Sequence, residues 1–183
     1  MDFSKIDLTN LPKGTRYIGY WSRLNRSDVL HIIIEQEPQK RTICVLEDED
    51  DDVSDHKKYF LSFPYTVYVA NLVVCDDFYS FSHIKVGFRE VPLQRPTDII
   101  NSLPLSNYAD RDLSVCLGDI VINNNRDPFQ IVKDAIAAYW SSSFTDATFE
   151  KKNKHWIKYD KIPPYSGYEV RCIPEDTITL FWK

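Results

Sequence analysis

One segment of the chain combines a helix start signal with helical spacing, and most of the sequence before it has the character of β-strands. Asp127 and Pro128 form the start signal, because Asp accepts hydrogen bonds from a first helical turn and proline lacks an N–H that would go unused there. Beyond them, apolar residues recur every three or four positions, at Phe129, Val132, Ile136 and Tyr139. We therefore expect one main helix over residues 128–140.

The strand candidates are runs rich in β-branched and aromatic residues that are separated by turn signals, at 17–23, 29–37, 41–47, 59–75 and 81–90. Runs 29–37 and 41–47 are separated by a short Pro-containing break, which predicts a hairpin. Runs 59–75 and 81–90 flank Asp76-Asp77 and predict a second hairpin. Within 59–75, Pro64 indicates a strand start, an edge or a bulge, because proline cannot donate to a β-ladder.

The alternation of residues also predicts which faces are covered. Both alternating sets in 67–72 are largely apolar, so this strand is expected to be buried on both faces. Run 81–90 alternates more cleanly, which predicts a half-exposed strand with His83 on its exposed face.

These elements give the expected fold class. We predict an α+β fold in a single domain, residues 1–183, with an antiparallel β-meander packed on one main helix. Two further strand candidates, 168–173 and 176–182, belong to an irregular, β-containing C-terminal extension.

Charge and composition argue against several classes of protein. The formal net charge is −5, which speaks against binding nucleic acid through its phosphates. No apolar stretch is long enough to cross a membrane, and the N-terminus lacks the features of a signal peptide. The expected location is the cytoplasm, or a host cytoplasm for a viral protein. The acidic run 47–55 contains seven carboxylates among its nine residues and is expected to be a solvated loop.

The common nucleotide, metal and hydrolase motifs are missing from the sequence. There are five glycines and no GxGxxG, P-loop or GxSxG pattern. The four histidines, His31, His56, His83 and His155, form no HxH or HxxxH pair, and no CxxC pair occurs. We therefore expect no cofactor and no metal.

The segment that includes Cys116 carries a motif with chemical meaning. Pro104-Leu-Ser-Asn107 and Ser114-Val-Cys116-Leu-Gly-Asp119 precede the predicted helix. This arrangement resembles the active-site region of ubiquitin-conjugating enzymes, which carry a His-Pro-Asn motif, a loop and then a Val/Ile-Cys-Leu motif. It looks closest to the divergent prokaryotic or phage-borne members of that superfamily, and the resemblance covers about residues 59–140.

The resemblance implies a catalytic cysteine at Cys116, which would carry a ubiquitin-like modifier as a thioester, and a supporting asparagine at Asn107. The partners it implies are an activating enzyme and the modifier itself. The chain departs from the family pattern at Leu105 and Ser106, which stand where the histidine and the proline would be. An asparagine amide near a developing oxyanion is a chemically sensible donor for acyl transfer.

Two alternatives remain beside this interpretation. Cys116 could be a buried core residue, because its neighbours are apolar and unpaired cysteines are often buried. Cys44, Cys75 and Cys172, which lie in apolar strand patterns, are expected to be core residues. The chain could also be a non-catalytic interaction or assembly subunit, for example of a phage, because aromatic residues near both ends suit a protein interface.

Overall fold

The computed structural model describes residues 6, 8–22, 27–46, 57–95, 98, 100 and 115–145. A short 3-10 helix at Leu8–Asn10 precedes the strands β1 (Thr15–Trp21), β2 (Val29–Gln36), β3 (Gln39–Leu46), β4 (Lys57–Phe63), β5 (Tyr65–Val74) and β6 (Tyr79–Arg89). The helix α1 (Pro128–Ser141) and the short strand β7 (Ser143–Thr145) follow. The predicted strands at 168–173 and 176–182 lie outside the described residues.

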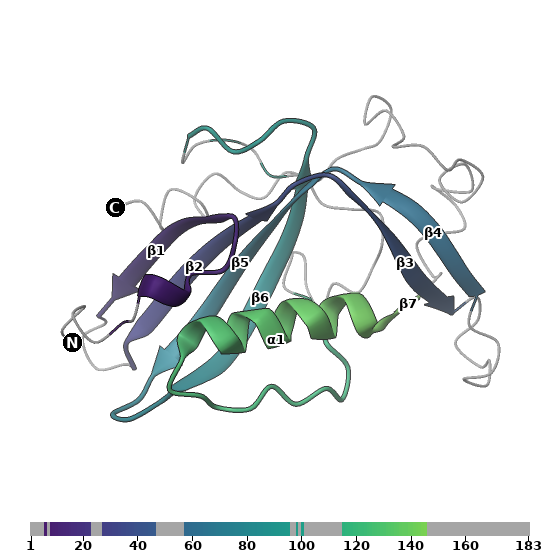
Figure 1. Ribbon diagram of the computed structural model, residues 1–183. Helices are drawn as coiled ribbons and strands as arrows, with labels where there is room; N and C mark the ends of the chain where they lie inside the picture. The colour runs from purple at the N-terminus through teal and green to yellow at the C-terminus, as the bar shows by residue number, and fades with distance from the viewer. Residues whose placement is uncertain are drawn as a thin grey trace.

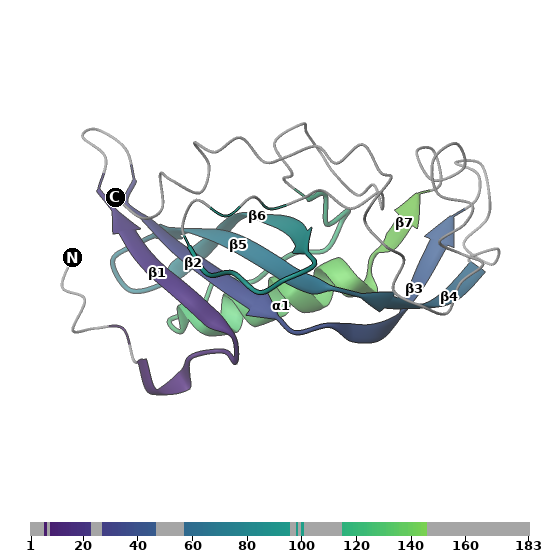
Figure 2. The ribbon, with the colours of Figure 1, turned by 90° about the horizontal axis from the view of Figure 1, so that it is seen from above.

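The strands form two sheets. The large sheet has the order β1-β2-β5-β6, and each neighbouring pair is antiparallel. The small sheet has the order β4-β3-β7, in which β7 runs parallel to β3. Helix α1 lies across one face of the large sheet and points toward the small one (Figures 1 and 2). The predicted α+β architecture, an antiparallel sheet packed on one main helix, is therefore confirmed.

Helix α1 forms where the sequence predicted it. The Asp127 side chain caps the helix and accepts a hydrogen bond from the backbone N–H of Phe129 at 2.9 Å, and Pro128 occupies the first turn. The apolar residues with helical spacing are all buried, whereas Lys133 and Asp134 are exposed. The helix thus presents one apolar face to the sheet.

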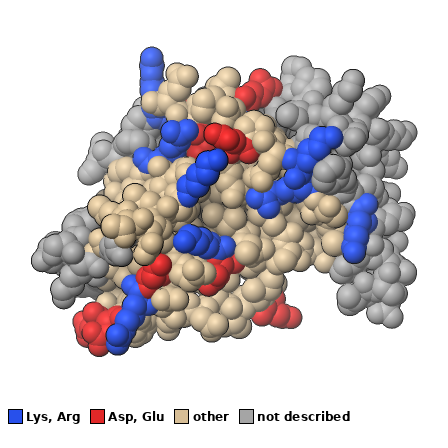
Figure 3. Space-filling model, viewed as in Figure 1, with Lys and Arg blue, Asp and Glu red and all other residues tan. Residues whose placement is uncertain are grey.

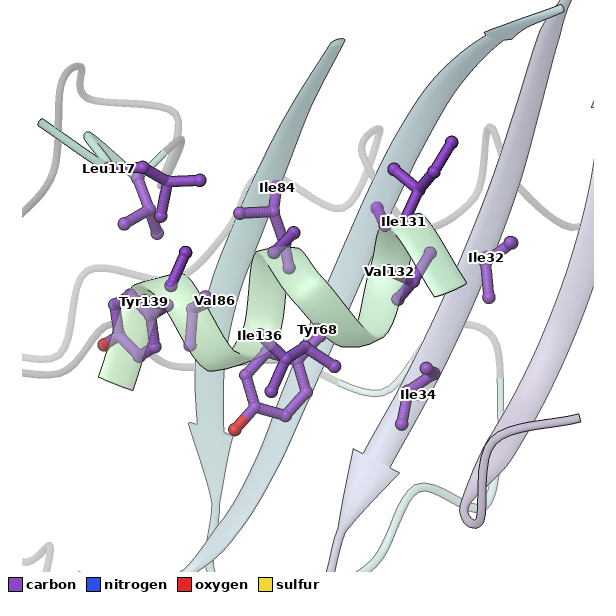
Figure 4. Packing of buried hydrophobic residues seen from close by; sticks show 14 of the residues in the cluster. Ile32, Ile34, Tyr68, Ile84, Val86, Leu117, Ile131, Val132, Ile136 and Tyr139 are labelled. Carbon is purple, nitrogen blue, oxygen red and sulfur yellow. The ribbon is translucent and has the colours of Figure 1, made fainter. Parts of the chain in front are cut away.

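The core lies between α1 and the large sheet. Figure 4 shows the helix residues Ile131, Val132, Ile136 and Tyr139 against the sheet residues Ile32, Ile34, Tyr68, Ile84 and Val86. A second cluster covers the opposite face of the sheet and contains Ile33, Val67, Val69 and Ile100, with Tyr17 and Leu93 packed against it. Strand β5 contributes to both clusters, so the prediction that it is covered on both faces is confirmed.

The predicted hairpin between runs 29–37 and 41–47 is wrong. Strand β2 pairs with β1 and β5, whereas β3 pairs with β4 and β7. The chain does not reverse at Pro38. The chain continues from β2 into β3, and later in the sequence it continues in the same way from β4 into β5. Because β2 pairs with β5 and β3 pairs with β4, the strands β2, β3, β4 and β5 form one long two-stranded ribbon (Figure 1).

The bend in this ribbon lies where two prolines face each other. Gln36 is paired with Thr66, and Gln39 is paired with Phe63 in the same register, which places Pro38 opposite Pro64. Neither proline can donate a backbone hydrogen bond, so the ladder is interrupted on both strands at one point. The predicted single strand 59–75 is therefore two strands that belong to different sheets. The acidic run 47–55, which connects β3 and β4, lies outside the described residues.

The predicted hairpin of β5 and β6 is confirmed, but the prediction that β6 is half exposed is wrong. Lys85 and Gly87 are buried, as are the apolar residues between and beside them. The chain after β6 is held against this face, because Leu93 and Ile100 pack into the second cluster. The backbone N–H of Leu93 also donates to the buried Glu35 carboxylate at 2.5 Å.

Candidate functional site

Cys116 lies in the segment that leads from β6 to α1, and its side chain is exposed. Its neighbours Val115 and Leu117 are both buried, at 8% exposure, and belong to the main core. The backbone N–H of Val115 donates to the carbonyl oxygen of Ile84 on β6 at 2.9 Å. Side chains alternate between core and solvent in extended backbone, so the two buried neighbours direct Cys116 outward.

The same segment is attached to β6 at a second point. The backbone N–H of Tyr79 donates to the Asn125 carbonyl at 2.7 Å, and the Asn125 N–H donates to the Tyr79 carbonyl at 3.1 Å. Between the two attachments, Gly118 adopts a positive φ of 62°, and the N–H of Ile120 donates to the Leu117 carbonyl at 3.3 Å. The cysteine is thus carried by a turn that is fixed at both ends.

The surface next to Cys116 combines polar and apolar groups. Gly118 and Asp119 are exposed, and so are Ile120 and Val121, at 42% and 80% exposure. Among the described residues there is no group of three or more His, Cys, Asp or Glu side chains that could hold a metal ion. The arrangement offers a solvent-accessible thiol, the group that acyl transfer to cysteine requires.

The second residue of the predicted site, Asn107, lies outside the described residues, as do Leu105 and Ser106. The structure therefore does not bring Asn107 and Cys116 together or separate them. The alternative that Cys116 is a buried core residue is wrong, because its apolar neighbours fill the core in its place.

The remaining cysteines differ from expectation in one respect. Cys44 and Cys75 are free thiols of intermediate exposure, so the prediction that they are core residues is wrong. Cys44 lies on β3, where it is paired with Lys58 and Ser143, and Cys75 follows β5 at the turn. Cys172 lies outside the described residues.

The structure also joins residues that the sequence pattern did not connect. His83, predicted to be exposed, is half-buried, and its Nε2 lies 2.5 Å from Asn71 Nδ2. The amide oxygen of Asn71 forms a hydrogen bond with Nδ1 of His31. Neither histidine is near a motif, and His31 is 40 positions from Asn71, so local spacing offered no signal. Pairing of the β-strands brings them together.

The described surface on the side viewed in Figure 3 shows basic and acidic side chains interspersed. No helix among the described residues is long and apolar enough to cross a membrane. Comparison with protein-family models, with curated proteins and with solved structures finds no match to this chain.

Proposed function

We propose that the chain is a thiol carrier of the ubiquitin-conjugating type, in which Cys116 takes the C-terminal acyl group of a ubiquitin-like modifier. The observation that carries the proposal is that Cys116 is exposed while the residues on either side of it, Val115 and Leu117, are buried in the core. The order of the elements is consistent with it: a meander of antiparallel strands, the cysteine segment and then a helix packed on the sheet.

The proposed step is a thioester exchange. The Cys116 thiolate attacks the carbonyl carbon of the thioester that links the modifier to its activating enzyme. A new S–C bond forms, and the thiolate of the activating enzyme leaves with the electron pair of the old one. The carbonyl oxygen is negatively charged in the intermediate, and an amide N–H such as that of Asn107 would stabilise it.

Fixing the cysteine segment would favour this reaction. The two backbone attachments to β6, at Ile84 and Tyr79, hold the turn in one position. A nucleophile held in position reacts faster than one on a mobile loop, because less conformational freedom is lost in the transition state. Exposure of Cys116 is equally necessary, because the other reactant is a protein-bound carbonyl that must reach the sulfur.

The first test is the alkylation rate of each cysteine in the native protein between pH 6 and 9, followed by peptide mass spectrometry. The half-buried Cys44 and Cys75 are internal controls. If Cys116 reacts fastest and continues to react well below pH 8.5, the usual midpoint of a free thiol, it is an activated thiolate. Equal and slow reaction of all the cysteines would contradict a catalytic role.

The second test is direct thioester formation. The chain is incubated with a peptide thioester that ends in glycine, and the product is analysed on gels with and without reducing agent. We expect a reductant-sensitive adduct on the wild type and a reductant-resistant oxygen ester, or no adduct, on Cys116→Ser. Cys75→Ser is the matched control and should behave as wild type. An adduct that persists unchanged in Cys116→Ser would refute the assignment.

A second candidate function, a non-catalytic interaction or assembly subunit, is favoured by a different observation. Trp21, Phe78, Ile120 and Val121 are exposed apolar residues. Trp21 and Phe78 lie at the same end of the large sheet, because Trp21 is paired with Val29, Val29 with Val73, and Phe78 lies in the β5–β6 turn. Ile120 and Val121 belong to the segment that ends at Asn125, which is paired with Tyr79. Exposed apolar side chains mark a protein interface where they form a contiguous patch, and this candidate requires such a patch among these residues.

This candidate predicts association that does not need the thiol. Sedimentation of the wild type would show a mass above that of the monomer, or a complex with a partner, that is retained in Cys116→Ser and lost in Val121→Asp. A monomer in all three proteins, with no complex recovered, would count against it. The two variants therefore distinguish the candidates. Cys116→Ser abolishes the activity of a thiol carrier, whereas Val121→Asp abolishes the association of an interaction subunit.

A further inference from the structure

A row of residues crosses the large sheet at one level on the face away from α1. Gly19 on β1 is paired with His31 on β2, His31 with Asn71 on β5, and Asn71 with His83 on β6. His31 and Asn71 are buried, with 9% and 5% exposure. Adjacent strands are about 4.8 Å apart, so the two histidines lie on either side of Asn71 at a separation of about 10 Å.

Asn71 contacts both imidazoles through the two ends of its amide. Its oxygen meets Nδ1 of His31, and its nitrogen lies 2.5 Å from Nε2 of His83. A carboxamide oxygen only accepts hydrogen bonds and the NH₂ only donates them. The imidazole nitrogen beside the NH₂ must therefore carry a lone pair, which only a neutral histidine has. Exchanging the two ends of the amide would transfer this requirement to the other histidine without removing it.

We infer that His31, Asn71 and His83 form a proton-sensitive bridge across the large sheet. The bridge is complete while at least one histidine is neutral, and it opens when both are protonated. In the arrangement seen, His83 is the acceptor, and its Nδ1 is 3.1 Å from the hydroxyl of Ser82. Neutral His83 with its proton on Nδ1 satisfies both contacts.

The groups around the bridge increase its sensitivity to acid. Lys85 lies on the same face of β6, two residues from His83, and is 9% exposed. Its positive charge opposes a second positive charge on a nearby imidazole. The edge of the Trp21 ring packs against the His31 ring, with centroids 6.2 Å apart, which limits access of water. The other titratable or charged groups that the described strands place on this face are Arg16 and Tyr17 on β1, Glu35 on β2, Tyr65 on β5 and Arg89 on β6, and Asp98 in the segment after β6 contacts Arg89.

The two carboxylates that the described residues place on this face, Glu35 and Asp98, are already engaged elsewhere. Glu35 accepts hydrogen bonds from Arg16 at 2.9 and 2.6 Å, and Asp98 accepts one from Arg89 at 3.2 Å. Glu35 is also four residues from His31 along β2, which is about 13 Å in a strand. These carboxylates therefore do not neutralise a doubly protonated bridge.

The free energy of unfolding depends on pH because the folded and the unfolded chain bind different numbers of protons at the two histidines. The folded chain needs a neutral acceptor, whereas in the unfolded chain both histidines take up protons around pH 6.5. Below that pH the unfolded state binds more protons than the folded state, so the free energy of unfolding decreases as the pH falls. Above it, the contribution of the bridge is fully present.

Histidine titration by NMR tests the inference on the full chain. We expect the acceptor of the bridge to titrate about one pH unit below His56, a tenfold difference in proton affinity. His56 precedes β4 in the sequence and is not one of the three bridge residues. In Asn71→Ala the difference should decrease, and the part that remains is due to the Lys85 charge and to the burial of the rings. Unchanged titration of both bridge histidines in Asn71→Ala would overturn the inference.

A second measurement does not depend on that variant folding. The midpoint of urea unfolding is measured at pH 7.5 and 5.0 for the wild type, His83→Gln and the control His56→Gln. Glutamine is neutral and its carbonyl can accept from Asn71, so His83→Gln should show a smaller fall on acidification, while His56→Gln should match the wild type. An equal fall in His83→Gln and wild type would refute the bridge.

Discussion

A hydrogen-bond network centred on Tyr68 supports the bend between the two sheets. The Tyr68 hydroxyl accepts from Nε1 of Trp140 at 2.6 Å and donates to Oε1 of Gln36 at 2.8 Å. The same Gln36 oxygen accepts from Gln39 and from Arg41, both at 2.9 Å. The Arg41 guanidinium lies 4.4 Å from the Trp140 ring centroid, so helix, β5 and both halves of the ribbon meet at one place.

The substitution Tyr68→Phe removes one oxygen from this network and leaves the fully buried ring in place. The Trp140 N–H loses its acceptor, which costs about 1–3 kcal/mol where water cannot replace it. The Gln36 oxygen keeps its two other donors, Gln39 and Arg41. Loss of the hydrogen bond from the Tyr68 hydroxyl to this oxygen therefore costs less, about 0.5 kcal/mol. We therefore expect the free energy of unfolding to fall by about 2 kcal/mol. At an m-value of about 2 kcal/mol/M, the urea midpoint decreases by about 1 M.

A double-mutant cycle identifies the hydrogen bond as the cause. Urea unfolding is followed by circular dichroism for wild type, Tyr68→Phe, Trp140→Phe and the double variant. Because the two side chains share one hydrogen bond, the effects should be less than additive by about 1 kcal/mol. Fully additive effects, or a change in the Tyr68→Phe midpoint below about 0.2 M, would refute the reasoning.

The same hydroxyl predicts a loss of stability at alkaline pH. Burial raises the pKa of Tyr68 above its ordinary value of 10.0. Above about pH 10, the unfolded chain releases a proton that the folded chain retains, so stability falls as the pH rises. Phenylalanine has no such proton, and Tyr68→Phe should therefore lose less stability than the wild type between pH 9 and 11.

Further predictions concern the helix cap and two glycines. Asp127→Ala removes the cap of α1 and should lower the free energy of unfolding by about 1 kcal/mol, measured in urea; no change in midpoint would contradict the capping role. Gly14 and Gly118 both have positive φ, but a Cβ on Gly14 would lie 2.0 Å from the Glu35 carbonyl oxygen, whereas one on Gly118 meets nothing within 4 Å. Thermal unfolding should therefore show Gly118→Ala destabilised by about 1 kcal/mol and Gly14→Ala by clearly more; equal shifts would disprove the steric argument.

Local sequence patterns were sufficient for the helix and for the positions of most strands. Helix α1 begins at its cap and its proline because both signals act within one turn. The β-branched and aromatic runs became strands, and the doubly apolar 67–72 became the strand buried on both faces. For the candidate site, the sequence pointed to Cys116 by resemblance, but the exposure of its side chain could not be read from apolar neighbours alone.

Tertiary structure decided how those strands pair and which polar groups become buried. A proline in one run signals an interruption, but whether the chain turns back or continues depends on the partner strand, and here Pro64 lies opposite Pro38. Lys85 is buried because the chain after β6 is held on its face of the sheet, a contact that the pattern of one strand cannot show. His31 and His83 meet through Asn71 only because β5 lies between β2 and β6. The sequence by itself determined the elements, and the long-range pairing of strands determined their neighbours.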